Sequence, residues 1–402
     1  MSTAEPTPVA AQSESYACPK CAGKMNFDAA QGRLSCPFCG HTMPVPQAAQ
    51  PAAISEHDLE AALKDASGKA RGYGTQLKSI KCQSCGAVLN VEPNITSTKC
   101  SFCGSNQVLE QQVDPNLYRP ESVVPFAVDD ARAHNLFRDW LGRGLFTPND
   151  LKRTGGGQKL RGVYLPFWTF DAHAESDWRA ESGDYYYETA WVNVVRDGRT
   201  VREQQQVQKV RWYWTNGHHA GGYDDVLVYA TRSIPTNLLH KVYPYDTKQL
   251  MPYQPQYLSG WSAESYQVPL AEAWPLGRDI IYQHERSACD SEVPGDTHRN
   301  LNVSTQLSDL TFKHVLLPVW VASYRYRDKT FRFMINGQTG RVEGEKPISW
   351  IKVTIAVVLA MVIIGVLIYL FARMDSAQSG ELLMWREYAL LHLQAQPVSL
   401  LL

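Results

Sequence analysis

The sequence predicts a multidomain protein with two small four-cysteine zinc ribbons, an α+β domain rich in antiparallel strands, and one C-terminal transmembrane helix. Three features of the 402-residue chain predict this architecture: two cysteine quartets of identical spacing, a middle region dense in Val, Tyr, Trp and Thr, and a late run of nineteen residues without a charge. Paired cysteines are typical of zinc sites, β-branched and aromatic residues favour strands, and about 20 apolar residues cross a bilayer.

The first segment, residues 1–15, is expected to be a disordered leader. Its residues are mostly Ala, Pro, Ser, Thr and Glu, which cannot bury enough apolar area to offset the entropy of ordering. It has neither the positively charged start nor the apolar stretch of a secretory signal.

The two cysteine quartets follow, in CPKCAGKMNFDAAQGRLSCPFCG and CQSCGAVLNVEPNITSTKCSFCG, each with two C-x2-C pairs separated by fourteen residues. Two such pairs complete a tetrahedron around Zn²⁺ with Zn–S bonds of about 2.3 Å. Disulfides need an oxidising compartment, and a thioredoxin-type motif uses one pair near a βαβ unit, so neither fits a duplicated quartet. We expect two structural zinc ions, in ribbons at residues 16–43 and 78–110. The predicted ligands are Cys18, Cys21, Cys36, Cys39, Cys82, Cys85, Cys100 and Cys103.

Residues 44–77 are expected to form a linker with one short helix. The linker begins with a Pro-, Ala- and Gln-rich stretch, which favours extended chain. Ser55 is the expected N-cap and Asp58 its capping-box partner, and apolar residues recur at helical spacing until Gly68.

Residues 111–347 are expected to form the β-rich α+β domain. Apolar spacing predicts helices at Asp129–Leu141 and Pro269–Arg286. Long strand-forming runs on either side of Arg196–Arg199 predict antiparallel strands joined by that turn, and Asn-Gly and Thr-Gly pairs predict a hairpin at Phe331–Glu345.

Two segments of this domain form a short internal sequence repeat. LPFW begins at Leu165 and LPVW begins at Leu317, and each runs into an alternating aromatic segment. We expect the two segments to be equivalent strands of one sheet.

The uncharged run Val353–Phe371 predicts a transmembrane helix at residues 351–371, followed by a short tail at residues 372–402. Within about twenty residues, three Lys or Arg residues precede the span and two follow it, which only weakly favours an N-terminal cytoplasmic side. Zinc thiolates stay reduced most easily in the cytoplasm. The expected location is therefore the inner (cytoplasmic) membrane, single-pass, with the N-terminal bulk in the cytoplasm.

No catalytic constellation stands out, and the chain is expected not to be an enzyme. Four-cysteine zinc sites are closed and leave no position for an activated water. His218 and His219, near Asp224 and Asp225, are the best alternative metal ligands, but no third ligand is indicated. A glycine-rich turn with surface histidines explains them better, because adjacent residues on extended chain point to opposite faces.

Cys289, the ninth cysteine, is interpreted as a small buried core residue that follows a helix. The alternative is a reactive thiol near His284 or His298. The glycine-rich segment 153–160 lacks the spacing of a phosphate-binding loop.

Two aromatic runs, Tyr185–Tyr187 and Trp212–Trp214, are interpreted as strands with one buried side. They could also be stacking platforms for single-stranded nucleic acid. Phe38 and Phe102 occupy the same position in the second cysteine pair of each ribbon, either as contact residues or as packing within the ribbon. A formal net charge of −1 gives no global reason for nucleic-acid binding.

These motifs together resemble a bacterial family of membrane proteins with transcription-factor-IIB-type zinc ribbons. The matching segments, besides the quartets and the span, are LPFWTFDA, YDDVLVYATRSIP, VPGDTHRNL, LLPVW and NGQTGRVEGEKP. Members often carry the name primosomal replication protein N-type helicase, although this chain has no nucleotide-binding loop. Relatives are associated with phage-shock-type envelope stress systems, which implies docking of a peripheral membrane protein.

The leading functional hypothesis is a non-enzymatic, membrane-anchored zinc-ribbon adaptor with the lipid bilayer and a protein at the cytoplasmic membrane face as partners. The alternative is a nucleic-acid-binding or replication-linked protein, motivated by the ribbons and the aromatic strands. A hydrolase that uses the two histidines ranks third.

Overall fold

The computed structural model describes residues 16–45, 54–64, 78–83, 87–91, 100, 102, 105, 108–111, 118–154, 160–196, 199–326 and 329–370. The expected leader at 1–15, most of the linker and the tail at 372–402 lie outside these residues. The chain divides into two compact units, one formed by Met1–Arg138 with Gly157–Glu345 and the other by Asp139–Gly156 with Lys346–Leu402.

The first ribbon is a three-stranded antiparallel sheet of β1 (Asn26–Asp28), β2 (Arg33–Ser35) and β3 (Thr42–Met43). It docks on the loop after the 3-10 helix η3 (Pro255–Leu258). There Ser259 Oγ donates a hydrogen bond to the Met25 carbonyl at 2.7 Å and Trp261 Nε1 donates to the Phe27 carbonyl at 3.1 Å. Gly260, between them, has a φ of +83°, and a Cβ there would lie 2.8 Å from the Asn26 side chain, so the close approach requires glycine.

The second ribbon is built into the main sheet. Its strands β5 (Lys78–Cys82), β6 (Val88–Val91) and β7 (Val108–Gln111) pair with one another, and β6 also pairs with β12 (Ser262–Glu264). Buried side chains of the ribbon share one hydrophobic core with α4 (Thr236–Val242) and with the long strands. Burial of these side chains removes apolar surface from water, at about 25 cal/mol per Å², and ties this ribbon to the body.

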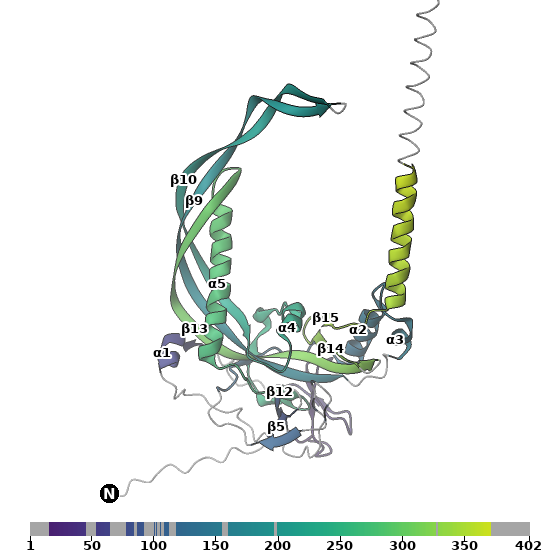
Figure 1. The fold of residues 1–402 in the computed structure, drawn as a ribbon. Coiled ribbons are helices and arrows are strands. Elements are labelled where there is room, and N and C mark those ends of the chain that lie inside the picture. The colour runs from purple at the N-terminus through teal and green to yellow at the C-terminus, as the bar shows by residue number, and fades with distance from the viewer. Residues whose placement is uncertain are drawn as a thin grey trace, which may run out of the picture. The chain divides into compact units, whose positions relative to one another are not determined.

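Three very long strands form the centre of the first unit (Figure 1). β9 (Arg161–Arg196) lies between β10 (Arg199–Tyr229) and β13 (Thr297–Tyr326), antiparallel to both. The predicted antiparallel pair is confirmed, because Arg196 is the direct partner of Arg199. Residues 197 and 198 of the predicted turn lie outside the described residues. The two segments of the internal repeat also lie in one sheet, as predicted, and Leu165 is the direct partner of Leu317.

Helix α5 (Leu270–Glu292) packs along this sheet (Figure 1). Its buried residues recur every three or four positions, which is the spacing of one helical face. Gly277 lies on that face, and a Cβ there would meet the Phe170 ring at 2.5 Å. The helix extends six residues beyond the predicted end at Arg286, and Cys289 therefore lies inside it rather than after it.

The short helix α1 (Leu59–Lys64) begins later than predicted. Asp58 is its N-cap, since Asp58 Oδ1 accepts a hydrogen bond from the Ala61 amide at 2.7 Å. Ser55 cannot cap it because β4 (His57–Asp58) is held as a strand against β13.

The remaining elements complete the first unit and begin the second. Asp129 caps α2 through a 2.7 Å hydrogen bond from the Arg132 amide, in agreement with the predicted helix. The predicted C-terminal hairpin is also present, as β14 and β15. The elements are α2 (Asp130–Gly142), α3 (Asn149–Thr154), β8 (Ser122–Val123), β11 (Met251–Pro252), η2 (Thr247–Gln249), β14 (Lys329–Asn336) and β15 (Val342–Gly344).

The second unit contains a C-terminal helix, Trp350–Leu370, that is long and apolar enough to cross a membrane. None of its most apolar 18-residue window is buried in the protein, unlike the core helix of a soluble domain. Within the unit, Lys352 Nζ donates to the Thr147 carbonyl at 2.7 Å and to Asn149 Oδ1 at 2.8 Å, which fixes the start of the helix against the segment before α3.

Candidate metal centre and exposed surfaces

The four cysteines of the first ribbon converge on one point. Cys18 and Cys36 are buried, Cys21 and Cys39 are exposed, and all four sulfurs lie within 4.8 Å of one another. The Sγ atoms of Cys18 and Cys39 are 3.5 Å apart, as are those of Cys21 and Cys36. A zinc tetrahedron with 2.3 Å bonds has edges of about 3.8 Å. The cluster therefore has the donors and the spacing to hold a metal ion.

Hydrogen bonds from backbone amides help to lower the pKa values of the two buried cysteines. Burial alone would raise the pKa of Cys36, but hydrogen bonds from the amides of Cys39 and Phe38 and from the side chains of Cys21 and Cys39 together lower it to about 7. The pKa of Cys18 is likewise lowered, because hydrogen bonds from the amides of Lys20 and Cys21 and from the side chains of Cys39 and Cys21 together outweigh its burial. Both environments favour the thiolate, which is the form that binds metal.

The second quartet repeats the same backbone geometry. In all four C-x2-C pairs the amide of the first cysteine donates to the carbonyl five residues later. The distances are 2.7 Å for Cys18–Gly23, 2.8 Å for Cys36–His41, 2.8 Å for Cys82–Ala87 and 2.8 Å for Cys100–Ser105. The first cysteine of every pair is also buried. Cys85 and Cys103 lie outside the described residues, so the arrangement of four sulfurs is seen in the first ribbon.

Phe38 and Phe102 occupy equivalent sequence positions but different environments. Phe38 is 76% exposed and Phe102 is 4% exposed. Phe102 joins the core that the second ribbon shares with the body, whereas the Phe38 ring lies over Gly23, where a Cβ would come within 2.6 Å of it. The contact interpretation thus fits Phe38, and the packing interpretation fits Phe102.

The aromatic run Tyr185–Tyr187 lies on a two-stranded extension of the sheet (Figure 1). β13 pairs with β9 only as far as Gly183, and beyond that point β9 has β10 as its neighbour. All three tyrosines are exposed. Tyr213 and Trp214 are also exposed, although they pair with Ser182 and Glu181, where β13 still lies beside β9. For Tyr185–Tyr187 the prediction of one buried side is therefore wrong, because in the described part of the chain no third strand continues to this end of the hairpin.

One face of the extension carries a line of large exposed side chains, which we call the outer stripe: Tyr185, Tyr187, Trp191 and Val195. Alternate strand residues share a face. Register places these four opposite Val210, Gln208, Gln204 and Thr200, so the stripe is bordered by uncharged side chains. Sequence analysis missed Trp191 and Val195, although their even spacing from Tyr185 was a signal that could have found them.

Comparison with known proteins shows the relationship of this chain. No family model and no solved structure matches it. It is 32% identical to the uncharacterized protein YdjG of Bacillus subtilis (strain 168), over 349 residues that cover 84% of this chain and 92% of YdjG. The chain belongs to the YdjG family. The match covers nearly the whole of YdjG, which is similar in length to this chain.

In this YdjG-family chain the two histidines lie in strand β10, and the predicted turn is wrong. Their opposite directions are confirmed, since His218 Nδ1 lies 3.0 Å from Asp177 on the solvent face and His219 Nδ1 lies 3.0 Å from Glu285 under α5. The hydrogen bond with Asp177 raises the pKa of His218. Cys289 is fully buried, as predicted for a core residue.

Asp225 belongs to a separate group around the buried Lys313. Lys313 Nζ lies 2.8 Å from Asp225, 2.9 Å from Glu56 and 3.7 Å from Asp171. Burial would lower the pKa of Lys313, but the neighbouring carboxylates outweigh it and raise the pKa. The lysine already supplies the positive charge that these carboxylates need, which argues against a metal ion at the Asp171, Asp224 and Asp225 cluster.

Glu264 provides a pH-dependent prediction at the junction of the second ribbon and the body. Burial raises its pKa to about 8 against the hydrogen bond from Ser233. The unfolded chain ionises this carboxyl near 4.5, so the contribution of Glu264 to folding stability should be fully present below that pH and should be lost as pH rises towards 8. Glu264→Gln should remove this dependence. Its stability relative to the parent should rise by about 1.4 kcal/mol per pH unit across that window.

The measurement is thermal unfolding of both proteins in detergent from pH 5 to pH 9. Because both proteins contain the same cysteines, the difference in melting temperature at each pH excludes any effect of the cysteines. A difference in melting temperature that stays constant with pH would contradict the raised pKa of Glu264.

Proposed function

We propose that this protein is a non-enzymatic, membrane-anchored adaptor that binds a protein partner through its hairpin extension. The observation that carries the proposal is the outer stripe on the two-stranded β9–β10 extension, where Tyr187 is 64% exposed and Trp191 is 59% exposed. An isolated two-stranded hairpin is marginally stable in water. Tyrosine and tryptophan are also the residues that most often dominate protein–protein binding energy.

The charge of the outer stripe favours a protein over a nucleic acid. On its face, residues 185–195 and 200–210 supply Tyr, Trp, Thr, Asn, Val and Gln, with Arg202 as the one cation and no anion. Binding to a phosphate backbone needs several cations, because each neutralised phosphate contributes through counterion release. The complementary partner surface is therefore apolar and uncharged.

The anchor and the ribbons complete the proposal. The Trp350–Leu370 helix would place the protein in the inner membrane, with the first unit in the cytoplasm, where thiols remain reduced. Two zinc ions would stabilise the ribbons, and the exposed Phe38 would add a second contact point. The resemblance to envelope-stress proteins supports a peripheral membrane protein as the partner.

The test compares three full-length proteins purified from native membranes in mild detergent: the parent, Tyr187→Ser/Trp191→Ser and Tyr186→Ser. Tyr186 is an exposed tyrosine on the opposite face of the same strand, which makes it a matched control. Each preparation is treated with nuclease, and co-purifying proteins are quantified by mass spectrometry. We expect a partner that survives nuclease, falls at least tenfold with the double variant and stays with the control.

Other outcomes separate the alternatives. Loss of all co-purifying material on nuclease treatment would favour the nucleic-acid alternative, in which the aromatics stack on bases. Equal partner recovery from all three proteins would exclude the outer stripe as the binding surface.

A further inference from the structure

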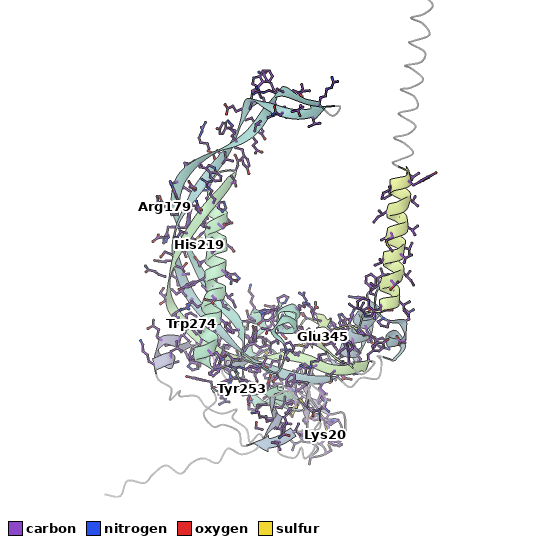
Figure 2. The ribbon with its side chains drawn as sticks, viewed as in Figure 1. Lys20, Arg179, His219, Tyr253, Trp274 and Glu345 are labelled. Atoms are coloured by element: carbon purple, nitrogen blue, oxygen red, sulfur yellow. The ribbon has the colours of Figure 1, made fainter. Side chains whose placement is uncertain are left out.

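A buried cluster between β10 and α5 lies outside the ribbons and is not used by the proposed adaptor function. It contains one nitrogen, one oxygen and one sulfur donor, from His219, Glu285 and Cys289, all within 4.8 Å of one another. Glu285 and Cys289 are one helical turn apart on α5, so their side chains share a face. Figure 2 shows His219 on the strand beside that helix.

From this geometry we propose that His219, Glu285 and Cys289 form a third metal site, for a divalent transition ion of the zinc type, with one coordination position left open. The sequence indicated no third ligand for the histidines, and the fold supplies two from a helix more than sixty residues later.

The donor set selects the kind of ion. Imidazole, carboxylate and thiolate are the three zinc ligand types, and three protein ligands with an open position are typical of zinc sites that also bind water. A thiolate disfavours Mg²⁺ and Ca²⁺, which prefer oxygen ligands. His219 Nδ1 and Glu285 Oε2 are 3.0 Å apart. Two bonds of about 2.0–2.1 Å at a tetrahedral angle separate such atoms by about 3.3 Å, so a small adjustment admits the ion.

The surroundings of Glu285 fit a ligand that is held in place. Tyr223 donates to Oε1 at 2.6 Å and Ser176 donates to Oε2 at 2.7 Å, while Ser176 also contacts Thr305 on β13 at 2.8 Å. Outer hydrogen bonds of this kind orient metal ligands. Gly221 keeps the space open, because a Cβ there would lie 2.6 Å from Glu285 Oε1.

The competing interpretation is a structural ion pair between His219 and Glu285. That pair needs no cysteine, yet Cys289 is fully buried with its sulfur within 4.8 Å of both groups. The His219 side chain is 21% exposed, which gives an ion a path from solvent. On binding, Cys289 releases its thiol proton to solvent. His219 carries its remaining proton on Nε2, so the Nδ1 lone pair faces the metal.

The test uses four full-length proteins in detergent: the parent, His219→Gln, Cys289→Ala and His218→Gln. His218 is the adjacent histidine on the same strand, directed to the solvent face, and is the matched control. Each is dialysed against buffered Zn²⁺, and metal per chain is measured by mass spectrometry. The ribbons are identical in all four proteins, so their zinc cancels in the comparison.

We expect the parent and His218→Gln to hold one more zinc per chain than His219→Gln and Cys289→Ala. Two further measurements keep the result independent of folding: circular dichroism of each variant, and Co²⁺ spectra, in which the parent should show one extra site with a single thiolate ligand. Equal zinc content in all four proteins would overturn the proposal. So would zinc loss from Cys289→Ala accompanied by loss of secondary structure while folded His219→Gln keeps its zinc.

Discussion

Replacing Cys36 with serine is expected to remove the metal ion from the first ribbon and to unfold that ribbon. The ribbon has three short strands and a small buried core that includes Met25, Phe27 and Leu34, too little to fold without help. Zinc binding supplies about 10–16 kcal/mol in comparable small domains. Cys36 is one of the two buried cysteines of the quartet whose thiolate form is favoured.

The measurements are zinc content and limited proteolysis of the full chain. Zinc should fall by one ion per chain and cleavage should appear within residues 18–43, while the melting temperature of the body stays close to that of the parent. Phe38→Ala, in the same cysteine pair but with a solvent-facing side chain, should keep its metal. Unchanged zinc in the Cys36 variant would show that the quartet is not a metal site.

Lys313→Met is expected to destabilise the first unit by about 3–5 kcal/mol at neutral pH, which is the usual effect of removing one partner from a buried charge group. The methionine fills a similar volume but leaves Asp225, Asp171 and Glu56 without their shared cation. Lys313 lowers the pKa of Glu56 through a hydrogen bond, and a depressed carboxyl pKa stabilises the fold above the unfolded pKa.

This stabilisation is present above pH 4.5, the ordinary pKa of a glutamate, and is lost as pH falls below it and Glu56 becomes protonated. The difference in free energy of unfolding between the parent and Lys313→Met should therefore narrow towards pH 4. Chemical unfolding in detergent at several pH values measures it, with Lys209→Met as the control, since Lys209 makes its ion pair with Glu188 in solvent and should change little. A gap that is independent of pH would mean that lost packing, and not lost charge, explains the effect.

Local patterns predicted much of this fold. Nearby residues determine the antiparallel pairing on either side of Arg196 and Arg199, the helix at Asp130–Gly142 and the apolar C-terminal helix. The end of α5 could also have been predicted from the sequence. Val293 precedes Pro294, and a residue before proline disfavours the helical conformation, which places the end at Glu292 and not at Arg286.

Features that depend on distant segments were not predictable. Strand alternation at Tyr185–Tyr187 predicts two faces, but whether either is covered depends on where β13 begins, at Thr297. Phe38 and Phe102 share a motif position, yet only Phe102 lies against core residues contributed by α4 and the long strands. Likewise Glu285 and Cys289 meet His219 only because α5 packs on that part of β10.

The pairing of β6 with β12 also sets an order of assembly during synthesis. The first ribbon closes with contacts between neighbouring residues and can form as soon as Met43 has left the ribosome. The edge of β6 must wait for Ser262–Glu264, some 170 residues later in the chain. Until then the cysteines of the second ribbon emerge without their finished scaffold, exposed to oxidants and to competing metal ions. During synthesis the second ribbon thus depends on a reducing compartment for longer than the first ribbon does.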